Sequence, residues 1–251
     1  MIAIGDIKKE LAETPVEEIV SFIEKHSSDE RGGVKTIIAG AEKKLQKYEA
    51  EKARTYEMYS YERMYSDKQY IAGIDEVGRG PLAGPVVTCC LILPKDYNIL
   101  YLNDSKKLSA AKRDELYDVL LKKAVSYSIG IMDNNVIDDI NILQATYKAM
   151  QQAINTMPVT PDQLLCDAVT IPEITIPQQG IIKGDAKSAS IAAASIVAKV
   201  TRDRMMDEYD KIYPQYGFAS NKGYGTKEHI EALKKYGPCE IHRRSFITSF
   251  C

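Results

Sequence analysis

The fold class is decided by YIAGIDEVGRGPLAGPVVTCCLIL, the stretch from Tyr70 to Leu93. It contains two apolar runs of strand length, Tyr70 to Asp75 and Val86 to Leu93, separated by a segment rich in Gly and Pro. Short apolar runs bounded by such turn residues are typical of buried strands. We therefore expect the two runs to form a hairpin of buried strands.

Strands and helices alternate after this hairpin. Ser109 and Thr226 each precede a helical pattern and can cap it, and Pro214 ends a long Ala-rich segment. The other expected elements are strands over Val125–Ile131, Gln163–Ala168 and near Ile181, and helices over Leu143–Met157 and Ala186–Tyr213. The predicted class is α/β, with a mixed sheet flanked by helices.

Residues 1–69 have a different texture and are predicted to form a small helical extension, with residues 70–251 as the main domain. The segment from Val34 to Ser66 is rich in Ala, Glu, Lys and Tyr, with apolar residues at helical spacing. Its lysines and tyrosines fit either a face that contacts nucleic acid or a solvated helix with charge pairs four residues apart. The solvated face is the simpler reading.

Composition limits the functional classes. Hydrophobic residues make up 45% of the chain, which suits a packed core, and the net charge of -2 provides no global attraction for nucleic acid. No membrane-spanning run or signal peptide is recognisable, so we expect a cytoplasmic protein without membrane association. The cysteines contain no C-x-x-C pair and indicate a reducing compartment, not a zinc or disulfide framework. They are Cys89, Cys90, Cys166, Cys239 and Cys251.

Four acidic residues stand where apolar or small residues are expected, at the ends of predicted strands and the start of a helix. They are Asp75, Glu76, Asp167 and Asp185. Buried carboxylates cost several kcal/mol unless a cation compensates them. A shared metal site would explain all four, and a set of oxygen ligands suits Mg²⁺ or Mn²⁺. For any single acid, a turn cap or a lysine partner is an equally good explanation.

The glycines of this region do not form a phosphate-binding loop. Arg79 and Gly80 stand where a nucleoside-triphosphate loop needs lysine and a hydroxyl residue. Gly78, Gly80 and Ala83 match a dinucleotide fingerprint, but a strand follows them in place of the helix that would receive a pyrophosphate.

The run DEVGRGPLAGP (Asp75 to Pro85) resembles the signature of ribonuclease HII, the type 2 ribonuclease H. Further segments similar to that family follow in order over residues 70 to about 246. They are NDSKKLS (103–109), LLCDAV (164–169), IIKGDAKSASIAAASIVAKVTRDR (181–204) and NKGYGTKEH (221–229). The resemblance implies a ribonuclease H-like fold with a metal-binding, catalytic carboxylate tetrad at Asp75, Glu76, Asp167 and Asp185.

The resemblance also implies an activity. Such an enzyme hydrolyses the RNA strand of RNA/DNA hybrids and nicks duplex DNA 5′ of single embedded ribonucleotides, with Mn²⁺ or Mg²⁺ as cofactor. It leaves a 3′-hydroxyl and a 5′-phosphate, and serves ribonucleotide excision repair and DNA replication. By resemblance, Gly78, Arg79 and Gly80 contact the 2′-hydroxyl, and Tyr224 helps to recognise the junction. We expect a monomer, with phosphate contacts from Lys106, Lys107 and Lys187, and further ones from Lys183, Lys222, Arg243 and Arg244.

Three alternatives stay open at this point. A type 3 ribonuclease H is the runner-up, although the Gly78-Arg79-Gly80 tripeptide and the helical extension resemble type 2. Another nuclease or strand transferase of the same fold would cut all-DNA duplexes. A non-catalytic hybrid-binding module would bind without turnover, and the intact set of four acids argues against it.

Overall fold

The computed structural model describes residues 2–96 and 98–250, and the chain divides into two compact units, Met1–Tyr56 and Glu57–Cys251. Cys251 lies outside the described residues, whereas Cys89, Cys90, Cys166 and Cys239 are free thiols. Within the described part of the chain, no helix combines the length and the apolar character needed to cross a membrane.

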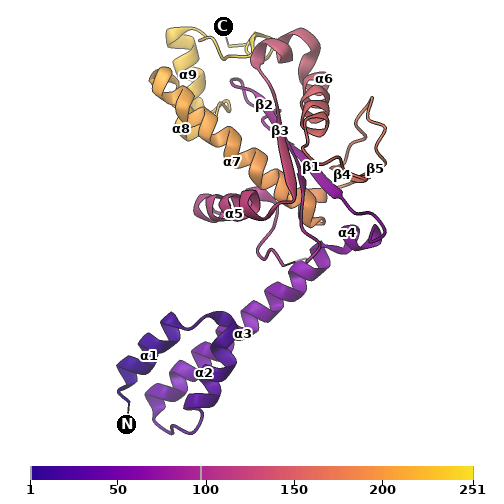
Figure 1. The fold of residues 1–251 in the computed structure, drawn as a ribbon. Coiled ribbons are helices and arrows are strands. Elements are labelled where there is room, and N and C mark those ends of the chain that lie inside the picture. The colour runs from indigo at the N-terminus through magenta and orange to yellow at the C-terminus, as the bar shows by residue number, and fades with distance from the viewer. Residues whose placement is uncertain (1, 97, 251) are drawn as a thin grey trace. The chain divides into compact units, whose positions relative to one another are not determined.

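The first unit is helical, as predicted. It contains α1 (Ile4–Glu13), the 3-10 turn η1 (Val16–Glu18), α2 (Ile19–His26) and most of α3 (Gly32–Met58), drawn in indigo to violet in Figure 1. Ile7, Ile19 and Phe22 form its small core with Val34 and Ala41 of α3. Each helix therefore buries one apolar stripe against the others.

The second unit is built on a five-stranded mixed sheet in the order β3-β2-β1-β4-β5. The strands are β1 (Ile71–Val77), β2 (Val86–Ile92), β3 (Ser126–Met132), β4 (Gln163–Asp167) and β5 (Gln178–Ile181). The pairs β1–β2 and β2–β3 are antiparallel, whereas β1–β4 and β4–β5 are parallel. The predicted hairpin and the mixed α/β class are confirmed.

Helices cover both faces of this sheet (Figure 1). In β2, Val87, Cys89 and Leu91 pack with α5 (Ala110–Lys123) and α7 (Ala189–Ile212), while Cys90 and Ile92 pack against α6 (Asn134–Asn155). Successive strand residues point to opposite faces, so a strand buried on both sides must be apolar throughout. This explains the run VVTCCLI, in which the polar residue Thr88 is buried and donates to the carbonyl oxygen of Gly130.

Helix α7 approaches β1 very closely. A Cβ added at Gly73 would lie 2.0 Å from the carbonyl carbon of Ser190, so only glycine permits this crossing. The small residues at the start of α7 serve the same purpose, and Ala192, Ala193 and Ala194 are fully buried. The close packing places the beginning of α7 over the strand that carries Asp75.

Helix α6 (Asn134–Asn155) begins earlier and ends earlier than the predicted helix Leu143–Met157, and one residue of the predicted apolar stripe is not buried. Leu143, expected in the apolar stripe, is 40% exposed. Asn141 interrupts the helix with φ 68°, and its side chain accepts hydrogen bonds from the N–H groups of Leu143 and Gln144. Asn141 thus caps a second helical segment, and Leu143 lies in its first turn, outside the buried face.

The remaining elements surround the ends of the sheet. The caps predicted at Ser109 and Thr226 are confirmed, since their side chains accept from the N–H groups of Lys112 and His229. The remaining elements of the second unit are α4 (Ser60–Met64), η2 (Ser105–Lys107), η3 (Gly184–Ala186), η4 (Pro214–Tyr216), α8 (Phe218–Asn221), α9 (Lys227–Tyr236) and η5 (Arg244–Phe246).

Candidate active site

Two of the predicted acids lie at the carboxyl ends of adjacent parallel strands. The register pairs Ile74 of β1 with Cys166 of β4, so Asp75 and Asp167 are the next residues on each strand. Parallel strands bring their carboxyl ends to the same edge of a sheet. The fold therefore places these two carboxylates side by side.

Asp75 is the most buried of the four acids, at 6% exposure. Burial raises the pKa of its carboxyl group well above the usual range, and the charges of Glu76 and Asp167 raise it further. A hydrogen bond with Ser195 of α7 opposes this effect, and Ser195 Oγ lies 3.0 Å from Ser105 Oγ. The strand, α7 and the NDSKKLS loop thus meet at Asp75.

Two cationic side chains, Arg79 and Lys106, partly offset the negative charge of Glu76. Burial and the charge of Asp167 raise the pKa of its carboxyl group, while Arg79 and Lys106 lower it. Arg79 Nη1 lies 3.5 Å from Glu76 Oε1. Lys106 is the first of the predicted phosphate-binding lysines. Its charge lowers the pKa of the Glu76 carboxyl group, which indicates that it lies near the acids.

Asp167 also organises the turn that carries the fourth acid. Its Oδ1 accepts a hydrogen bond from Gly184 N at 2.7 Å. Next in the chain, Asp185 has a carboxyl pKa raised by burial and by the charges of Asp104 and Asp167, with Lys106 lowering it. All four predicted acids therefore lie in one electrostatic neighbourhood, and Asp104 joins them as an acid that the sequence reasoning missed.

The four carboxylates are near one another but do not form a finished cage. Among residues 2–96 and 98–250, no three His, Cys, Asp or Glu side chains are close enough together to hold a metal ion as they stand. Desolvation and mutual repulsion nevertheless raise the pKa values of Asp75, Glu76 and Asp185. A hard divalent cation would relieve both effects, so the donor set fits Mg²⁺ or Mn²⁺.

Two buried arginines hold the backbone of the segment from Gly78 to Pro85. Arg243 donates to the carbonyl oxygens of Gly84, Arg79 and Gly78 at 2.9, 3.0 and 2.5 Å. Arg202 donates to the carbonyl oxygens of Pro85, Lys222 and Ala83 at 2.9, 2.8 and 3.1 Å. Both guanidinium groups are fully buried, and burial lowers their pKa values, to about 10 for Arg202 and about 9 for Arg243.

These contacts explain why residue 78 is glycine, but they do not explain the glycine at residue 80. Gly78 has φ +94°, and an added Cβ would lie 2.3 Å from Arg202 Nε, so the fold itself requires glycine there. At Gly80 an added Cβ would meet nothing closer than Cε1 of Tyr224, at 3.8 Å. Internal packing does not demand glycine at residue 80, and the space beside it faces the exposed ring of Tyr224.

Tyr224 is held by its backbone and is 43% exposed. Its carbonyl oxygen accepts from His229 Nδ1 at 2.8 Å, and the two imidazoles of His229 and His242 meet through their Nε2 atoms at 3.0 Å. Cys239 N donates to His242 Nδ1, so His242 is neutral and carries its proton on Nε2. That proton is donated to His229 Nε2, which must therefore be unprotonated, so His229 is neutral as well. Burial lowers both histidine pKa values, to about 4 for His242.

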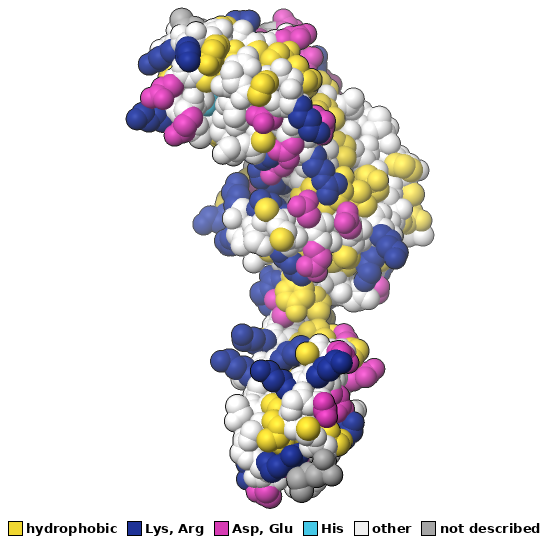
Figure 2. All heavy atoms as spheres, turned by 90° about the vertical axis from the view of Figure 1, so that its left-hand side faces the viewer, with side chains coloured by type: hydrophobic (Ala, Val, Ile, Leu, Met, Phe, Trp, Pro, Cys, Tyr) yellow, Lys and Arg dark blue, Asp and Glu magenta, His cyan; other side chains and the backbone are white. Residues whose placement is uncertain are grey.

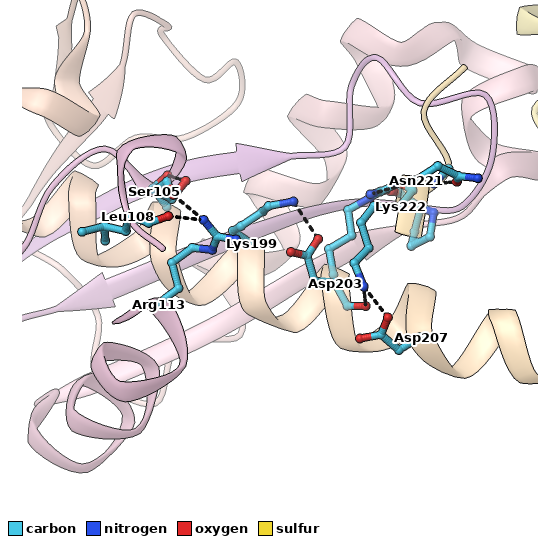
Figure 3. A network of polar contacts seen from close by, with 12 residues as sticks. Ser105, Leu108, Arg113, Lys199, Asp203, Asp207, Asn221 and Lys222 are labelled. Atoms are coloured by element: carbon cyan, nitrogen blue, oxygen red, sulfur yellow. Dashed lines mark hydrogen bonds and ion pairs between the residues drawn. The ribbon is translucent and has the colours of Figure 1, made fainter. Parts of the chain in front are cut away.

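Some of the predicted phosphate-binding residues are exposed, and others already contact groups of the protein itself. Lys106, Lys107, Lys183 and Lys187 are exposed, as is Arg244. The expectation for Arg243 is wrong, because its guanidinium is buried against loop carbonyls, where no phosphate reaches it. Lys222 is already engaged by Asp207 and the Asp203 carbonyl (Figure 3).

The same network supports the loop that bears Lys106. Arg113 Nη1 donates to the carbonyl oxygens of Ser105 and Leu108 at 3.0 and 2.6 Å, while Lys199 pairs with Asp203 at 2.7 Å on α7 (Figure 3). Figure 2 shows Lys and Arg interspersed with Asp and Glu over the visible face. Because the net charge of the chain is -2, attraction for phosphate has to come from local groups such as the exposed lysines Lys106, Lys107, Lys183 and Lys187.

Comparison with known proteins places this geometry in a family. A family model described as "Ribonuclease HII" matches residues 72–249, and one described as "Ribonuclease HII N-terminal domain" matches residues 3–66. The chain belongs to the ribonuclease HII family. It is accordingly a hydrolytic endoribonuclease of type 2, and the type 3 assignment considered from the sequence is not supported.

Individual relatives agree with the family assignment. The chain is 58% identical to the ribonuclease HII of Lachnoclostridium phytofermentans over 246 residues, 98% of this chain and 97% of the relative. Its fold is similar to the crystal structure of the ribonuclease H2 of Pyrococcus horikoshii, with TM-score 0.60, 28% identity and 70% and 93% of the two chains covered. It is also similar to the Archaeoglobus fulgidus ribonuclease HII solved in complex with PCNA, with TM-score 0.61, 25% identity and coverage of 70% and 94%.

Proposed function

We propose that this ribonuclease HII-family chain hydrolyses the RNA strand of RNA/DNA hybrids and nicks duplex DNA on the 5′ side of a single embedded ribonucleotide. The products are a 3′-hydroxyl and a 5′-phosphate. The observation that carries the proposal is the arrangement of the open Gly80, the ring of Tyr224 and the Glu76–Arg79 pair at one loop. The loop that approaches a ribose thus continues directly into the carboxylates that would act on its phosphate.

We propose that Asp75, Glu76, Asp167 and Asp185 hold Mg²⁺ or Mn²⁺. Their oxygen atoms are the donors that these ions prefer. Burial, and next the charges of neighbouring carboxylates, raise the pKa values of Asp75, Glu76 and Asp185, and a bound cation would oppose both effects. When bound, such an ion lowers the pKa of a water molecule and stabilises the leaving oxygen of a phosphodiester.

The surrounding residues would position the substrate. Lys106 influences Glu76 and Asp185, so it would hold a phosphate next to the site of cleavage. Lys107 follows Lys106 in the chain, Lys187 lies two residues after Asp185, and both are exposed. They would contact phosphates farther from the site of cleavage. These contacts orient the duplex without reading its sequence, which suits an enzyme that must act wherever a ribonucleotide occurs.

Discrimination would come from the Gly-Arg-Gly loop. A protein distinguishes RNA from DNA by reading the 2′-hydroxyl, and backbone groups of Gly78, Arg79 and Gly80 can approach a ribose without obstruction at Gly80. Arg243 would keep those backbone groups in place, because it donates to the carbonyl oxygens of Gly78 and Arg79. Arg202 would hold the following residues of the loop through the carbonyl oxygens of Ala83 and Pro85. A site built to bind a hydroxyl rejects the analogue that lacks it by roughly 10⁴-fold or more.

We further propose a cytoplasmic monomer that acts on ribonucleotide-containing DNA in repair and replication, without membrane association. The free thiols of Cys89, Cys90, Cys166 and Cys239 suit a reducing compartment. Size-exclusion chromatography with light scattering tests the oligomeric state.

The decisive experiment compares matched DNA duplexes that differ by one ribonucleotide. With Mg²⁺ or Mn²⁺, the chain should nick the ribonucleotide-containing strand on the 5′ side and leave the all-DNA duplex whole. Equal cutting of both duplexes would favour a nuclease that does not read the ribose. Tight binding without cleavage, at any concentration of either metal, would favour a hybrid-binding module.

A further inference from the structure

Glu62 is a buried acid that the proposed chemistry does not use. It lies in α4, just before β1, and is 3% exposed. Its Oε1 accepts two hydrogen bonds, from Ser188 Oγ at 2.7 Å and from Ser190 N at 2.8 Å. Both donors belong to the beginning of α7, so Glu62 connects two elements that are distant in sequence.

These contacts complete the N-terminus of α7. Ser188 is the N-cap, and its Oγ accepts from Ile191 N at 3.3 Å while donating to Glu62. The first N–H groups of a helix have no partner within the helix, and a carboxylate there also interacts favourably with the helix dipole. Glu62 therefore caps α7 from another segment of the chain, at the Ser190 N–H that Ser188 leaves unpaired.

The capped end of α7 is joined to the candidate site by a short path. The N–H groups of Lys187 and Ser188 donate to Gly184 O at 2.9 and 2.8 Å, and Gly184 N donates to Asp167 Oδ1 at 2.7 Å. Asp185 lies between Gly184 and these residues in the same turn. Moving the start of α7 would thus move Asp185 relative to Asp167.

Stability alone is a poor reason for an acid at this position. Burial raises the pKa of the Glu62 carboxyl group, although its contacts with Ser188 and Ser190 lower it in part. Among the described residues, Glu62 Oε2 and Ser190 Oγ are buried and make no hydrogen bond of normal geometry. They line a cavity of about 10 Å³ with Ile71 and Leu93. A well-packed apolar residue is often neutral or stabilising in place of such a group. The two specific hydrogen bonds to α7 are what Glu62 provides and an apolar residue would not.

We propose that Glu62 is a positioning residue that fixes the Gly184–Ala186 turn through α7 and so sets the placement of Asp185 beside Asp167. The proposal rests on the proposed function, in which these two acids hold a divalent cation. It gives the segment before β1 a direct role in assembling the metal site.

The test measures binding of Mn²⁺ alone to the full chain, by electron paramagnetic resonance of the free ion, without substrate. E62A removes the acceptor and E62D draws it back by one methylene, so both should weaken Mn²⁺ binding by about three- to tenfold. E62Q keeps an oxygen that accepts from Ser188 and Ser190, and should bind Mn²⁺ like the unmodified chain. E57A is the matched control, because Glu57 is an exposed acid at the start of the same unit and should have no effect.

D185N separates the proposal from the function on which it rests. If D185N leaves Mn²⁺ binding unchanged, the assignment of the metal ligands fails. If D185N weakens binding while folded E62D and E62A stay within twofold of the unmodified chain, the positioning role of Glu62 is refuted. E62D keeps the question decidable if E62A does not fold. Weakening of Mn²⁺ binding by E62Q to the level of E62A would also overturn the proposal, since the acceptor would then not be what matters.

Discussion

The ring of Tyr224 lies beside Gly80, with its Cε1 3.8 Å from the position that a Cβ at residue 80 would occupy. The backbone of Tyr224 is anchored by His229, whereas its ring is partly exposed. An anchored backbone with an exposed ring suits stacking against a nucleotide held over the glycine loop.

Tyr224→Ala should lower cleavage at a single ribonucleotide by about 10- to 100-fold, the loss expected for one aromatic stacking contact. Binding of Mn²⁺ should not change, because the ring does not contact the acids. Single-turnover cleavage and Mn²⁺ titration measure the two effects. Tyr236→Ala is the control, since Tyr236 is 53% exposed on α9, and full activity of Tyr224→Ala would leave Tyr224 as part of a turn.

Asp167→Asn should abolish turnover without unfolding the chain. Asparagine keeps an oxygen that accepts from Gly184 N, so the turn that carries Asp185 should persist. What is lost is one of the negative charges that we propose to hold the metal. Circular dichroism and a cleavage assay measure the two properties, and near-normal cleavage would remove Asp167 from the mechanism.

Arg243→Lys should destabilise the chain and reduce its preference for ribose. A lysine ammonium has no planar fork and does not reproduce the three hydrogen bonds to Gly84, Arg79 and Gly78. We expect a loss of about 3 kcal/mol in the free energy of unfolding, as for a broken buried polar network. Urea denaturation measures this loss, and the cleavage ratio of ribonucleotide to all-DNA duplexes measures the preference.

The neighbouring residue offers a control for this prediction. Arg244 is exposed, so Arg244→Lys keeps a charge at the surface and should change neither stability nor preference. Equal behaviour of the two variants would show that the buried fork of Arg243 does not shape the loop.

Asp75→Asn should stabilise the chain in a chelating buffer, and more so at higher pH. The folded-state pKa of Asp75 is raised above its ordinary value, mainly by burial. Between the two pKa values the folded state binds more protons than the unfolded state, so stability falls as the pH rises through this window. Asparagine is neutral throughout and avoids that loss, while it keeps a polar group for Ser195.

Thermal melts in chelator across a pH series measure this effect. The melting temperature of Asp75→Asn should exceed that of the unmodified chain above the folded-state pKa, by about 2–4 °C for each kcal/mol gained. The difference should vanish below the ordinary pKa of aspartate. A constant difference at all pH values would show that ionisation of Asp75 is not the cause.

Two truncations test where the catalytic unit begins. The sequence suggests a boundary at residue 69, whereas the second compact unit starts at Glu57. A chain beginning at Glu57 should fold and retain cleavage. One beginning at Gln69 lacks Tyr59 and Glu62, both buried, and should lose at least about 3 kcal/mol of stability. Urea denaturation compares them, and equal stability would place the boundary at residue 69.

The sequence alone was enough to predict the strands, the capped helices and the four acids. Strand runs such as VVTCCLI and caps such as Ser109 and Thr226 depend on neighbouring residues, and local patterns report local structure. The acids stood out because charge is unexpected at buried strand ends. The motif DEVGRGPLAGP then indicated the family that the comparisons confirm.

Only the tertiary structure decided the residues that hold the site in shape. Arg243 contacts Gly78 across 165 positions of sequence, and Glu62 contacts Ser188 across 126. No local periodicity encodes such pairs, and an arginine read in isolation suggests a phosphate contact as readily as a buried support. Burial determines which it is, because a guanidinium removed from water must find its acceptors inside the protein, and folding alone determines which carbonyl oxygens are within reach.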